Sequence, residues 1–368
     1  MYNKEELVLL WFDYNDYSFL KLEKILKNFN DISALFDKNI VKNAVFDDAF
    51  AEIKQKLLNE DFDKFEQKVV DELDKHNITA ITFVSKNYPE KLKTIDEPPL
   101  VLYAKGDVSL LQKKTISIVG TRTPTDYGKI VCEKFTKDLS RAGLVTVSGL
   151  AYGIDTIVAE TSLESGGKTI AVLGGGLDSI YPASNTGLAD RVSKQGLLVS
   201  EYRIGIKPQA YHFVNRNRIV SALGLGTLII EAGKKSGTMT TAKFAIEQSR
   251  ELFVVPGNIY SKLSEGTNNL IDQMPDTFTI SPDRILYRLG IVKKLEQQKF
   301  YFGDDKTSES SSGSDENKIL KQLDGGELSF DELCEKTGMK PAEISSELIR
   351  LEMFGLVKKG SGNIYYKL

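Results

Sequence analysis

The sequence contains very little cysteine and histidine. Cys132 and Cys334 are the two cysteines, too few for a disulfide framework and without any metal-ligand spacing. We expect both to be reduced, structural thiols. The two histidines, His76 and His212, are too few and too far apart to build a metal site. The sequence therefore predicts no bound metal.

Long apolar runs are also missing. No stretch approaches the ~18 uninterrupted apolar residues that a membrane-spanning helix needs. The opening segment, MYNKEELVLLWFDYNDY, has acidic residues before and inside its short apolar stretch and no small-residue cleavage site, which argues against a secretory signal. The apolar fraction of 41% is that of ordinary globular protein. We expect a cytoplasmic protein with no membrane partner, and 368 residues indicate two or three domains.

The net charge of −3 is small, but the charges are unevenly distributed. Residues 1–105 carry 15 basic and 20 acidic groups, residues 106–285 carry 20 and 17, and residues 286–368 carry 13 and 14. The excess positive charge therefore lies in the middle of the chain. A local basic groove is compatible with this balance, because the field at a site depends on charges within about a Debye length, ~8 Å at physiological salt.

Glycine is absent before Gly106, whereas residues 106–285 are rich in it. Before this change, apolar residues recur at helical spacing, which predicts a helical domain over residues 1–76. A short strand is expected at 78–83, followed by a lead segment that cannot be helical through Pro98 and Pro99. We expect the next domain to span residues 77–290.

Short β-branched runs alternate with amphipathic segments from Thr115 onward. The runs are TISIVG, LVTVSG, TIAVLG, LLVSE, TLIIEA and LFVVPG, spaced about 25–30 residues apart. Near-continuous apolar strands that end in glycine are typical of βαβ units with a buried parallel sheet. The predicted fold class is thus α/β, an extended Rossmann-like, doubly wound and mostly parallel sheet.

The segment at 300–315 is rich in Ser, Asp and Gly, and it is predicted to be a flexible linker. Residues 316–368 then follow the order helix, helix, helix and hairpin. This order predicts a C-terminal winged-helix domain with PAEISSELIRLEMFG in the position of the recognition helix. That segment has one Arg and three Glu, which disfavours major-groove binding, and we expect it to mediate protein contacts.

The loops after the strands are expected to carry function, because ligands of open α/β sheets bind outside the carboxyl ends of the strands. Three such loops combine glycines with a following helix: Gly120-Thr121-Arg122, SGLAYGID, and EAGKKSGT at 231–238. Backbone N–H groups at helix starts, together with Arg122 and the lysines, suit phosphate. Together the loops predict an anion-binding trough.

The segment YHFVNRNR at 211–218 adds an aromatic residue and two arginines to the same edge. A base can stack on Phe213 while arginines take the phosphates of a nucleic-acid strand. Phe213 is alternatively a core residue at the start of a helix. Arg216 and Arg218 point in different directions on a helix, so one can be functional and the other structural.

Three tempting motifs fail in their context. GGKT at 166–169 precedes a strand, whereas a phosphate-binding P-loop lysine opens a helix. GGG at 174–176 has Ser179 at the third dinucleotide-binding position, so no nicotinamide cofactor is expected. Ser148 and Asp155 could be taken for a catalytic pair, but a hydroxyl before a glycine turn is better explained as a cap. We expect no cofactor and no catalytic residues.

Six ordered blocks over about residues 80–285 resemble the core of the DNA-processing protein A (DprA/Smf) family. They are SIVGTRTPTDYG, SGLAYGIDTIVAE, LGGGLDSIYPASNTGL, FVNRNRIV, EAGKKSGTMTTAKFAIEQSRELFVVPG and GTNNLI. The resemblance implies a homodimer that binds single-stranded DNA and helps load the RecA recombinase in natural transformation, without being an enzyme. It also implies an N-terminal helical, sterile-alpha-motif-like domain as an accessory. The DNA-binding residues it implies are Arg122, Gly149, Phe213, Arg216, Arg218, Lys235, Ser236, Gly237 and Thr238.

Two other functions stay open from the sequence. A nucleotide phosphoribohydrolase of the lysine-decarboxylase-like (LOG) type has a similar Rossmann fold, but its P-G-G-x-G-T motif has only poor matches here, VPGN and EGTNN. A transcription regulator would depend on duplex recognition by the winged helix. Detectable release of ribose phosphate, or sequence-specific duplex binding, would identify either one.

Overall fold

The structure is a computed structural model that describes residues 2–29, 31–46, 50–292, 313–353, 356–360 and 362–367. The chain forms two compact units, Met1–Glu296 and Gln297–Leu368, which are described separately. Apart from its last three residues, the linker predicted at 300–315 lies outside the described residues. Among the described helices, none is both long enough and apolar enough to cross a membrane.

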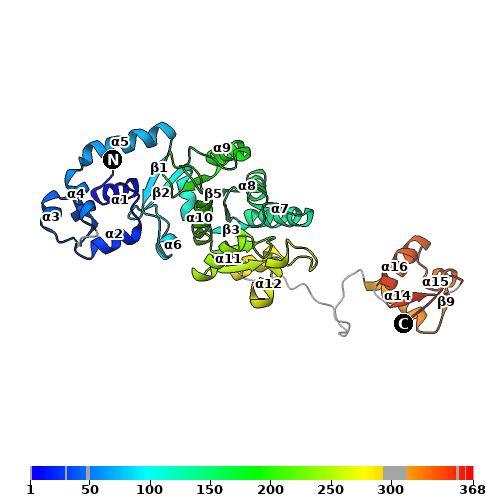
Figure 1. Cartoon of the computed structure of the whole chain (residues 1–368). Coiled ribbons are helices and arrows are strands. Elements are labelled where there is room, and N and C mark those ends of the chain that lie inside the picture. Colours follow the sequence, from blue (N-terminus) through cyan, green and yellow to red (C-terminus); the bar gives the residue numbers. More distant parts are fainter. Residues whose placement is uncertain are drawn as a thin grey trace. The chain divides into compact units, whose positions relative to one another are not determined.

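The first unit begins with a group of helices, as predicted (Figure 1). They are α1 (Lys4–Tyr14), α2 (Phe19–Leu26), the 3₁₀ helix η1 (Ile32–Phe36), α3 (Lys38–Asn43), α4 (Ala51–Asn59) and α5 (Phe62–His76). Side chains of Asn3, Ser18, Asp37 and Asp61 accept backbone N–H groups at the starts of α1, α2, α3 and α5. These caps explain why the helices begin where they do.

An eight-stranded sheet follows, in the order β1-β2-β6-β5-β4-β3-β7-β8. The strands are β1 (Thr79–Thr82), β2 (Val101–Gly106), β3 (Thr115–Val119), β4 (Val145–Ser148), β5 (Thr169–Leu173), β6 (Leu197–Ser200), β7 (Gly226–Ile229) and β8 (Glu251–Val254). The six strands from β3 to β8 pair in parallel, which confirms the doubly wound α/β prediction. Strand β2 was not expected from the sequence; it pairs antiparallel with β1 and β6.

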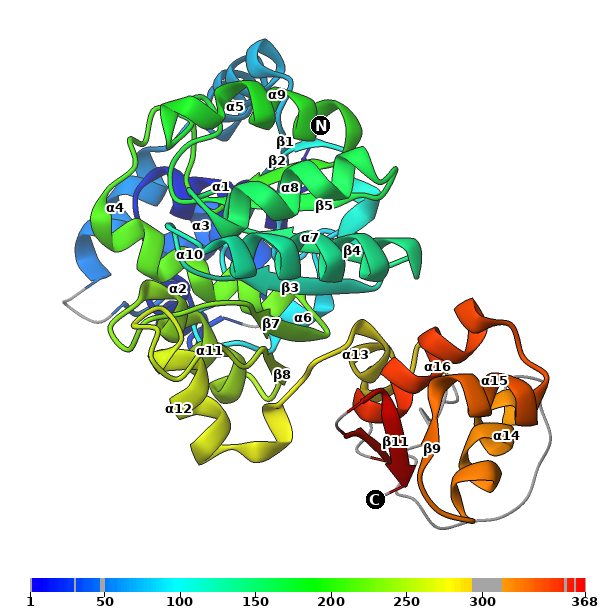
Figure 2. The ribbon, with the colours of Figure 1, turned by 90° about the vertical axis from the view of Figure 1, so that its right-hand side faces the viewer.

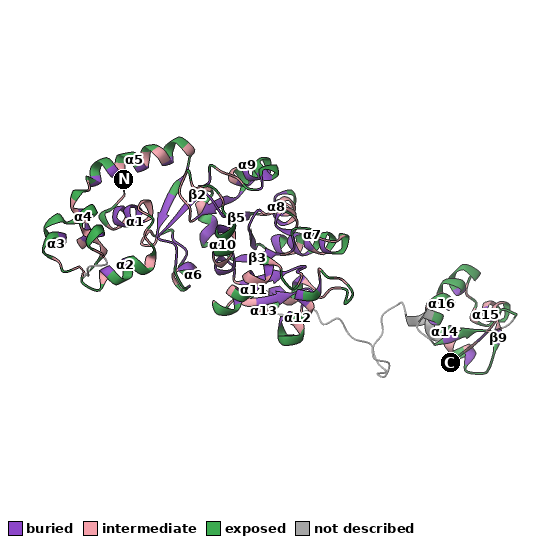
Figure 3. Cartoon of the chain, viewed as in Figure 1, coloured by how far each residue is buried: buried purple, intermediate pink, exposed green. Residues whose placement is uncertain are grey.

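Helices cover both faces of the sheet (Figure 2). Alternate residues of β3 divide between them: Ile116 and Ile118 belong to the core with α7 and α8, whereas Ser117 hydrogen-bonds Val220 of α10. The helices are α6 (Glu90–Lys93), α7 (Asp126–Arg141), α8 (Ile154–Glu164), α9 (Thr186–Gln195), α10 (Ala210–Leu223), α11 (Gly237–Glu247), α12 (Glu265–Gln273) and α13 (Pro282–Arg288). The strands are accordingly almost wholly buried (Figure 3).

The N-terminal helices share an apolar core with one end of the sheet. Val8 and Trp11 of α1 are fully buried in the same cluster as Val101 and Tyr103 of β2. The hydroxyl of Ser85 also donates a hydrogen bond of 2.7 Å to Glu6. Residues on both sides of position 76 thus pack in one compact unit, and the domain boundary placed there from the sequence stays a prediction.

The second unit has its own core and the predicted order of three helices and a hairpin, with one strand, β9, that the sequence analysis did not predict between the first two helices. Its elements are α14 (Gly313–Leu323), β9 (Leu328–Ser329), α15 (Phe330–Thr337), α16 (Pro341–Met353), β10 (Val357–Lys359) and β11 (Ile364–Lys367). The strands form a small antiparallel sheet in the order β10-β11-β9. Ile319, Leu333, Ile344 and Leu348 are buried together beneath it.

Candidate nucleic-acid interface

A groove of about 900 Å³ opens at the carboxyl ends of the parallel strands. From β3 the chain proceeds through β4, β5 and β6 on one side and later returns to place β7 and β8 on the other. Between β3 and β7 the connections therefore diverge, which is where open α/β sheets bind ligands. The groove is lined by the loops after β3, β4 and β7 and by α10.

The loop after β3 is fixed by a buried carboxylate of the loop after β7. Glu231, 2% exposed, accepts hydrogen bonds from the backbone N–H and the hydroxyl of Thr125, at 2.9 and 2.7 Å. Thr125 also caps the start of α7, and the backbone N–H of Thr121 donates to the Glu231 carbonyl at 2.7 Å. The segment that carries Arg122 is consequently anchored at both ends.

The loop after β4 is held between two buried charged residues. Asp155 accepts the N–H groups of Gly149 and Ala151 at 3.1 and 3.4 Å. Arg216 donates from Nη1 to the carbonyl of Gly149 at 2.6 Å and also to the carbonyl of Val172. A Cβ atom at Gly149 would lie 2.4 Å from Nη2 of Arg216, so any larger residue here would displace the Arg216 guanidinium.

Burial sets the electrostatics of this pair. Arg216 is 3% exposed and Asp155 is 7% exposed. Burial raises the pKa of Asp155, and the positive charge of Arg216 opposes that rise. Burial likewise lowers the pKa of Arg216, against the attraction of Asp155. Each residue therefore stabilises the charged form of the other.

One wall of the groove combines an aromatic ring with a cation. Phe213, near the start of α10, is half-buried, and the guanidinium carbon of the exposed Arg122 lies 5.9 Å from the centroid of its ring. The ring of Tyr181 also contacts Phe213: their centroids lie 5.2 Å apart, and the angle between the ring planes is 46°. Tyr181 is itself 47% exposed. This wall offers aromatic surface to a base beside a positive charge.

The opposite part of the groove is the start of α11. Ser236 caps this helix, since its hydroxyl oxygen accepts the N–H of Thr238 at 3.2 Å. Lys235 precedes the cap and is exposed, and Gly237 leaves the backbone open. The helix dipole favours an anion here.

The groove thus brings together Arg122, Phe213, Arg216 and the segment 235–238, while Gly149 lies behind Arg216. Arg218 is not among them. It forms an ion pair of 2.5 Å with Glu201, with side-chain exposures of 15% and 14%, and borders a separate hollow of about 670 Å³. Among the described groove-lining residues, Asp155 is the one carboxylate, so cations predominate.

Sequence reasoning missed Tyr181 in the lining, and it named the segments that contain Asn217 and Glu231 without assigning these two residues a role. Tyr181 follows β5 within the loop that also contains the glycine run at 174–176, so the strand-end rule applied to β5 would have found it. The three predicted loops do meet at one groove, but anion binding there and the roles of its residues stay predictions. In the described part of the chain no group of three His, Cys, Asp or Glu side chains could hold a metal ion.

Comparisons with known proteins agree with this architecture. Residues 79–290 match the family of DNA recombination-mediator protein A, and residues 304–363 match the DprA winged helix domain. The DNA processing protein DprA of Bacillus subtilis (strain 168) is 44% identical over 226 residues, which are 60% of this chain and 76% of that protein. Protein Smf of Synechocystis sp. (strain ATCC 27184 / PCC 6803 / Kazusa) is 33% identical over 328 residues, 81% and 82% of the two chains.

Two solved structures are also similar. DNA processing protein A (DprA) from Streptococcus pneumoniae aligns with a TM-score of 0.60 and 31% identity over 77% of this chain and 92% of that one. DNA processing protein A from Helicobacter pylori, whose structure describes a single-stranded DNA binding mode, aligns with a TM-score of 0.53 and 32% identity over 58% and 95%. The resemblance drawn from the six sequence blocks is confirmed, and the chain belongs to the DNA recombination-mediator protein A (DprA/Smf) family.

Proposed function

We propose that this protein binds single-stranded DNA in the groove and acts in DNA processing during natural transformation and homologous recombination. The observation that carries the proposal is the meeting of Arg122, Phe213 and Lys235 around one groove at the diverging point of the sheet. Cations that take phosphates beside a ring that stacks a base suit an unpaired strand, whatever its sequence. The described binding mode of the Helicobacter pylori relative supports the same ligand.

The proposal also covers the oligomeric state, the protein partner and the cellular location. We propose that the protein is a cytoplasmic homodimer that protects incoming strands and helps load the RecA recombinase onto them. We also propose that it works without catalysis. Among the described residues that line the groove, Asp155 is the one carboxylate, and it accepts two backbone N–H groups; both oxygens of Glu231 accept from Thr125. Both carboxylates therefore serve to hold loops in place, which disfavours the phosphoribohydrolase alternative.

Fluorescence-anisotropy titration of labelled oligo-dT and of a duplex of equal length, at two salt concentrations, tests the proposal. We expect tighter, salt-dependent binding of the single strand. Arg122→Ala and Lys235→Ala should each weaken binding and reduce the salt slope by ~0.7, the value for one phosphate contact on a single strand. Phe213→Ala should lose ~1–3 kcal/mol with an unchanged slope, because stacking releases no counterions.

Lys114→Ala provides the matched control. Lys114 is exposed but directly precedes β3, at the edge of the sheet opposite the groove, so its removal should change neither affinity nor slope. Preference for the duplex, or unchanged binding by both groove-cation variants, would refute the groove as the binding site.

A further inference from the structure

The loop between β8 and α12, residues 256–264, presents two large apolar side chains to solvent. Ile259 is 78% exposed and Tyr260 is 90% exposed. Single exposed apolar residues are common on protein surfaces, but here two are adjacent on one loop. The loop contains one charged side chain, the exposed Lys262. An aromatic ring and a cation two positions apart repeat the chemistry of the groove wall.

The loop is internally fixed. The side-chain amide of Asn268 makes two hydrogen bonds of 3.1 Å to Gly257, one to its N–H and one to its carbonyl. Asn258 accepts the N–H of Tyr260 at 2.9 Å on its side-chain oxygen. The hydroxyl of Tyr127, on α7, donates to the carbonyl of Pro256 at 2.8 Å. The backbone around Tyr260 is therefore fixed before any ligand arrives, so that little backbone entropy is lost on binding.

The loop also continues the groove. Leu263 is one of the groove-lining residues. The N–H of Gly266 donates to the carbonyl of Ala232 at 2.8 Å, and a Cβ atom at Gly233 would lie 3.2 Å from the carbonyl oxygen of Lys262. The loop thus packs on the segment that carries Lys235.

We propose that a nucleic-acid strand leaving the groove past Lys235 runs over this loop, where Tyr260 stacks a base and Lys262 takes a phosphate. The inference rests on the proposed function and extends the binding path beyond the groove. A second copy of the chain is the other candidate occupant of the two apolar side chains. The adjacent groove cations and the charge of Lys262 favour nucleic acid as the occupant. Its phosphates attract cations whatever its sequence, whereas contact between two copies of the chain does not depend on them.

Binding of an oligo-dT series from about 4 to about 16 nucleotides by the full chain tests the inference. Tyr260→Ala should match the wild type on the shortest oligonucleotide that binds and fall about five- to tenfold behind it on longer ones. Tyr260→Phe keeps the ring and should behave as the wild type, as should the neighbouring control Ile259→Ala. Equal affinities of Tyr260→Ala and the wild type at every length would overturn the inference alone. Failure of the wild type to bind any oligonucleotide would overturn the proposed function with it.

Fluorescence of Tyr260→Trp supplies a second readout. The chain has one tryptophan, Trp11, which is buried in α1, so an added exposed indole has a distinguishable emission. Long oligo-dT should quench this emission, and the shortest one should not. Light scattering on Tyr260→Ala tests whether a second copy of the chain covers the loop instead. We expect the molar mass of the variant to equal that of the wild type. A fall to half the wild-type mass would assign the loop to contact between copies and overturn the inference.

Discussion

At the scale of single residues, two arginines on α10 lie in opposite environments although they are two positions apart. Successive positions on a helix turn by about 100°, so Arg216 and Arg218 project about 200° apart. Arg216 reaches the strand ends and hydrogen-bonds Gly149, while Arg218 pairs with Glu201 on the other side of the helix. Arg216 lines the groove, but its hydrogen bonds first hold the loop that forms the groove. We infer that Arg216 acts mainly as a positioning residue.

Arg216→Ala should destabilise the fold as well as weaken binding. The change leaves Asp155 buried without its opposite charge and removes the donor from the carbonyls of Gly149 and Val172. Leaving a buried hydrogen-bond acceptor without its donor costs ~1–3 kcal/mol, and denaturant unfolding can measure this loss for the two carbonyls. Arg122→Ala, at an exposed position, should lose binding with less than ~0.5 kcal/mol of stability. Wild-type stability of Arg216→Ala would contradict the positioning role.

The sequence predicted which residue types line the groove, but not which of them hold its loops in place and which face the ligand. Arg122, Phe213 and Lys235 were found because glycine-rich loops and aromatic-basic segments after strands are local signals. The role of Glu231 was missed because its partner Thr125 is 106 residues away, so that only the fold brings the two together. The choice between Arg216 and Arg218 depends on how α10 is rotated against the sheet, and the sequence of one helix does not determine that rotation.

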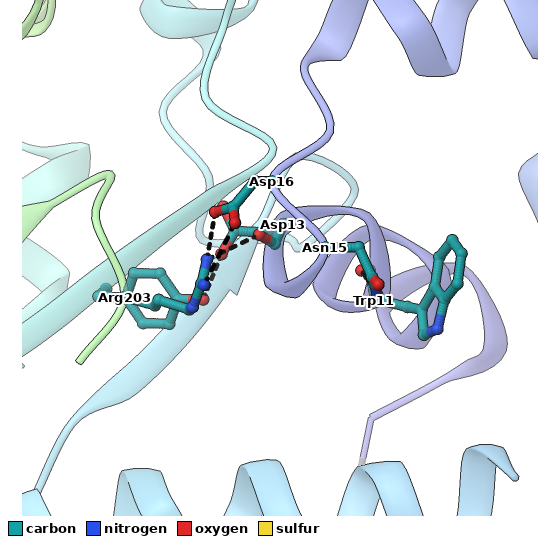
Figure 4. A network of polar contacts seen from close by, with 6 residues as sticks. Trp11, Asp13, Asn15, Asp16 and Arg203 are labelled. Atoms are coloured by element: carbon teal, nitrogen blue, oxygen red, sulfur yellow. Dashed lines mark hydrogen bonds and ion pairs between the residues drawn. The ribbon is translucent and has the colours of Figure 1, made fainter. Parts of the chain in front are cut away.

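At the scale of elements, α1 is joined to the sheet through a buried carboxyl group (Figure 4). Asp13 accepts a hydrogen bond of 2.5 Å from the hydroxyl of Tyr103 on β2. Arg203, after β6, donates to the Asp13 carbonyl at 3.3 Å and pairs with Asp16 at 2.6 Å. Burial raises the pKa of Asp13 to about 7; Tyr103 and Arg203 oppose the rise, and Glu201 and Asp16 add to it.

This carboxyl group should make stability depend on pH. Its pKa is higher in the folded chain than the ordinary 3.8, so the folded state holds a proton that the unfolded state has lost between about pH 4 and pH 7. Its contribution is complete below pH ~4 and is lost as the pH rises through ~7. Asp13→Asn keeps an acceptor for Tyr103 and removes the charge. Relative to the wild type, the variant should gain ~2–4 kcal/mol between about pH 4.5 and pH 8.

Denaturant unfolding of both proteins across this pH range gives the measurement, and the difference between them cancels the other titrating groups. Asp16→Asn is the matched control, because Asp16 is 75% exposed in its pair with Arg203 and should change stability by less than ~1 kcal/mol. A pH-independent difference between Asp13→Asn and the wild type would mean that Asp13 is ionised in the fold throughout this range.

Elements with local signals were predicted, and one with a non-local origin was missed. The six parallel strands are runs of β-branched residues that end in glycine or a polar residue, and each was found. Strand β2 follows Pro98 and Pro99, so its run was taken as part of an extended lead between domains. It becomes a strand because β1 and β6 pair with it on both sides, and β6 lies almost 100 residues further along the chain.

At the scale of the whole molecule, the groove lies entirely within the first compact unit, and the winged helix has a separate core. The electrostatics of the second unit also differ from those of the groove. On α16, Glu343 and Glu352 are exposed, and Arg350 pairs with Glu347 at 2.7 Å. A helix with this surface is repelled by phosphates when placed in the recognition position.

A chain ending at residue 296 should consequently keep the oligo-dT affinity of the full protein within about twofold at equal salt, with the same salt slope, because it loses no groove cation. Anisotropy titration of the two chains measures this, and far-UV circular dichroism with thermal unfolding checks that the shorter chain is folded. The isolated unit 313–368 should bind neither oligo-dT nor duplex at the same concentrations. A tenfold loss of affinity in the shortened chain would make the winged helix part of the DNA interface, with the wing lysines Lys358 and Lys359 as the phosphate contacts to replace next.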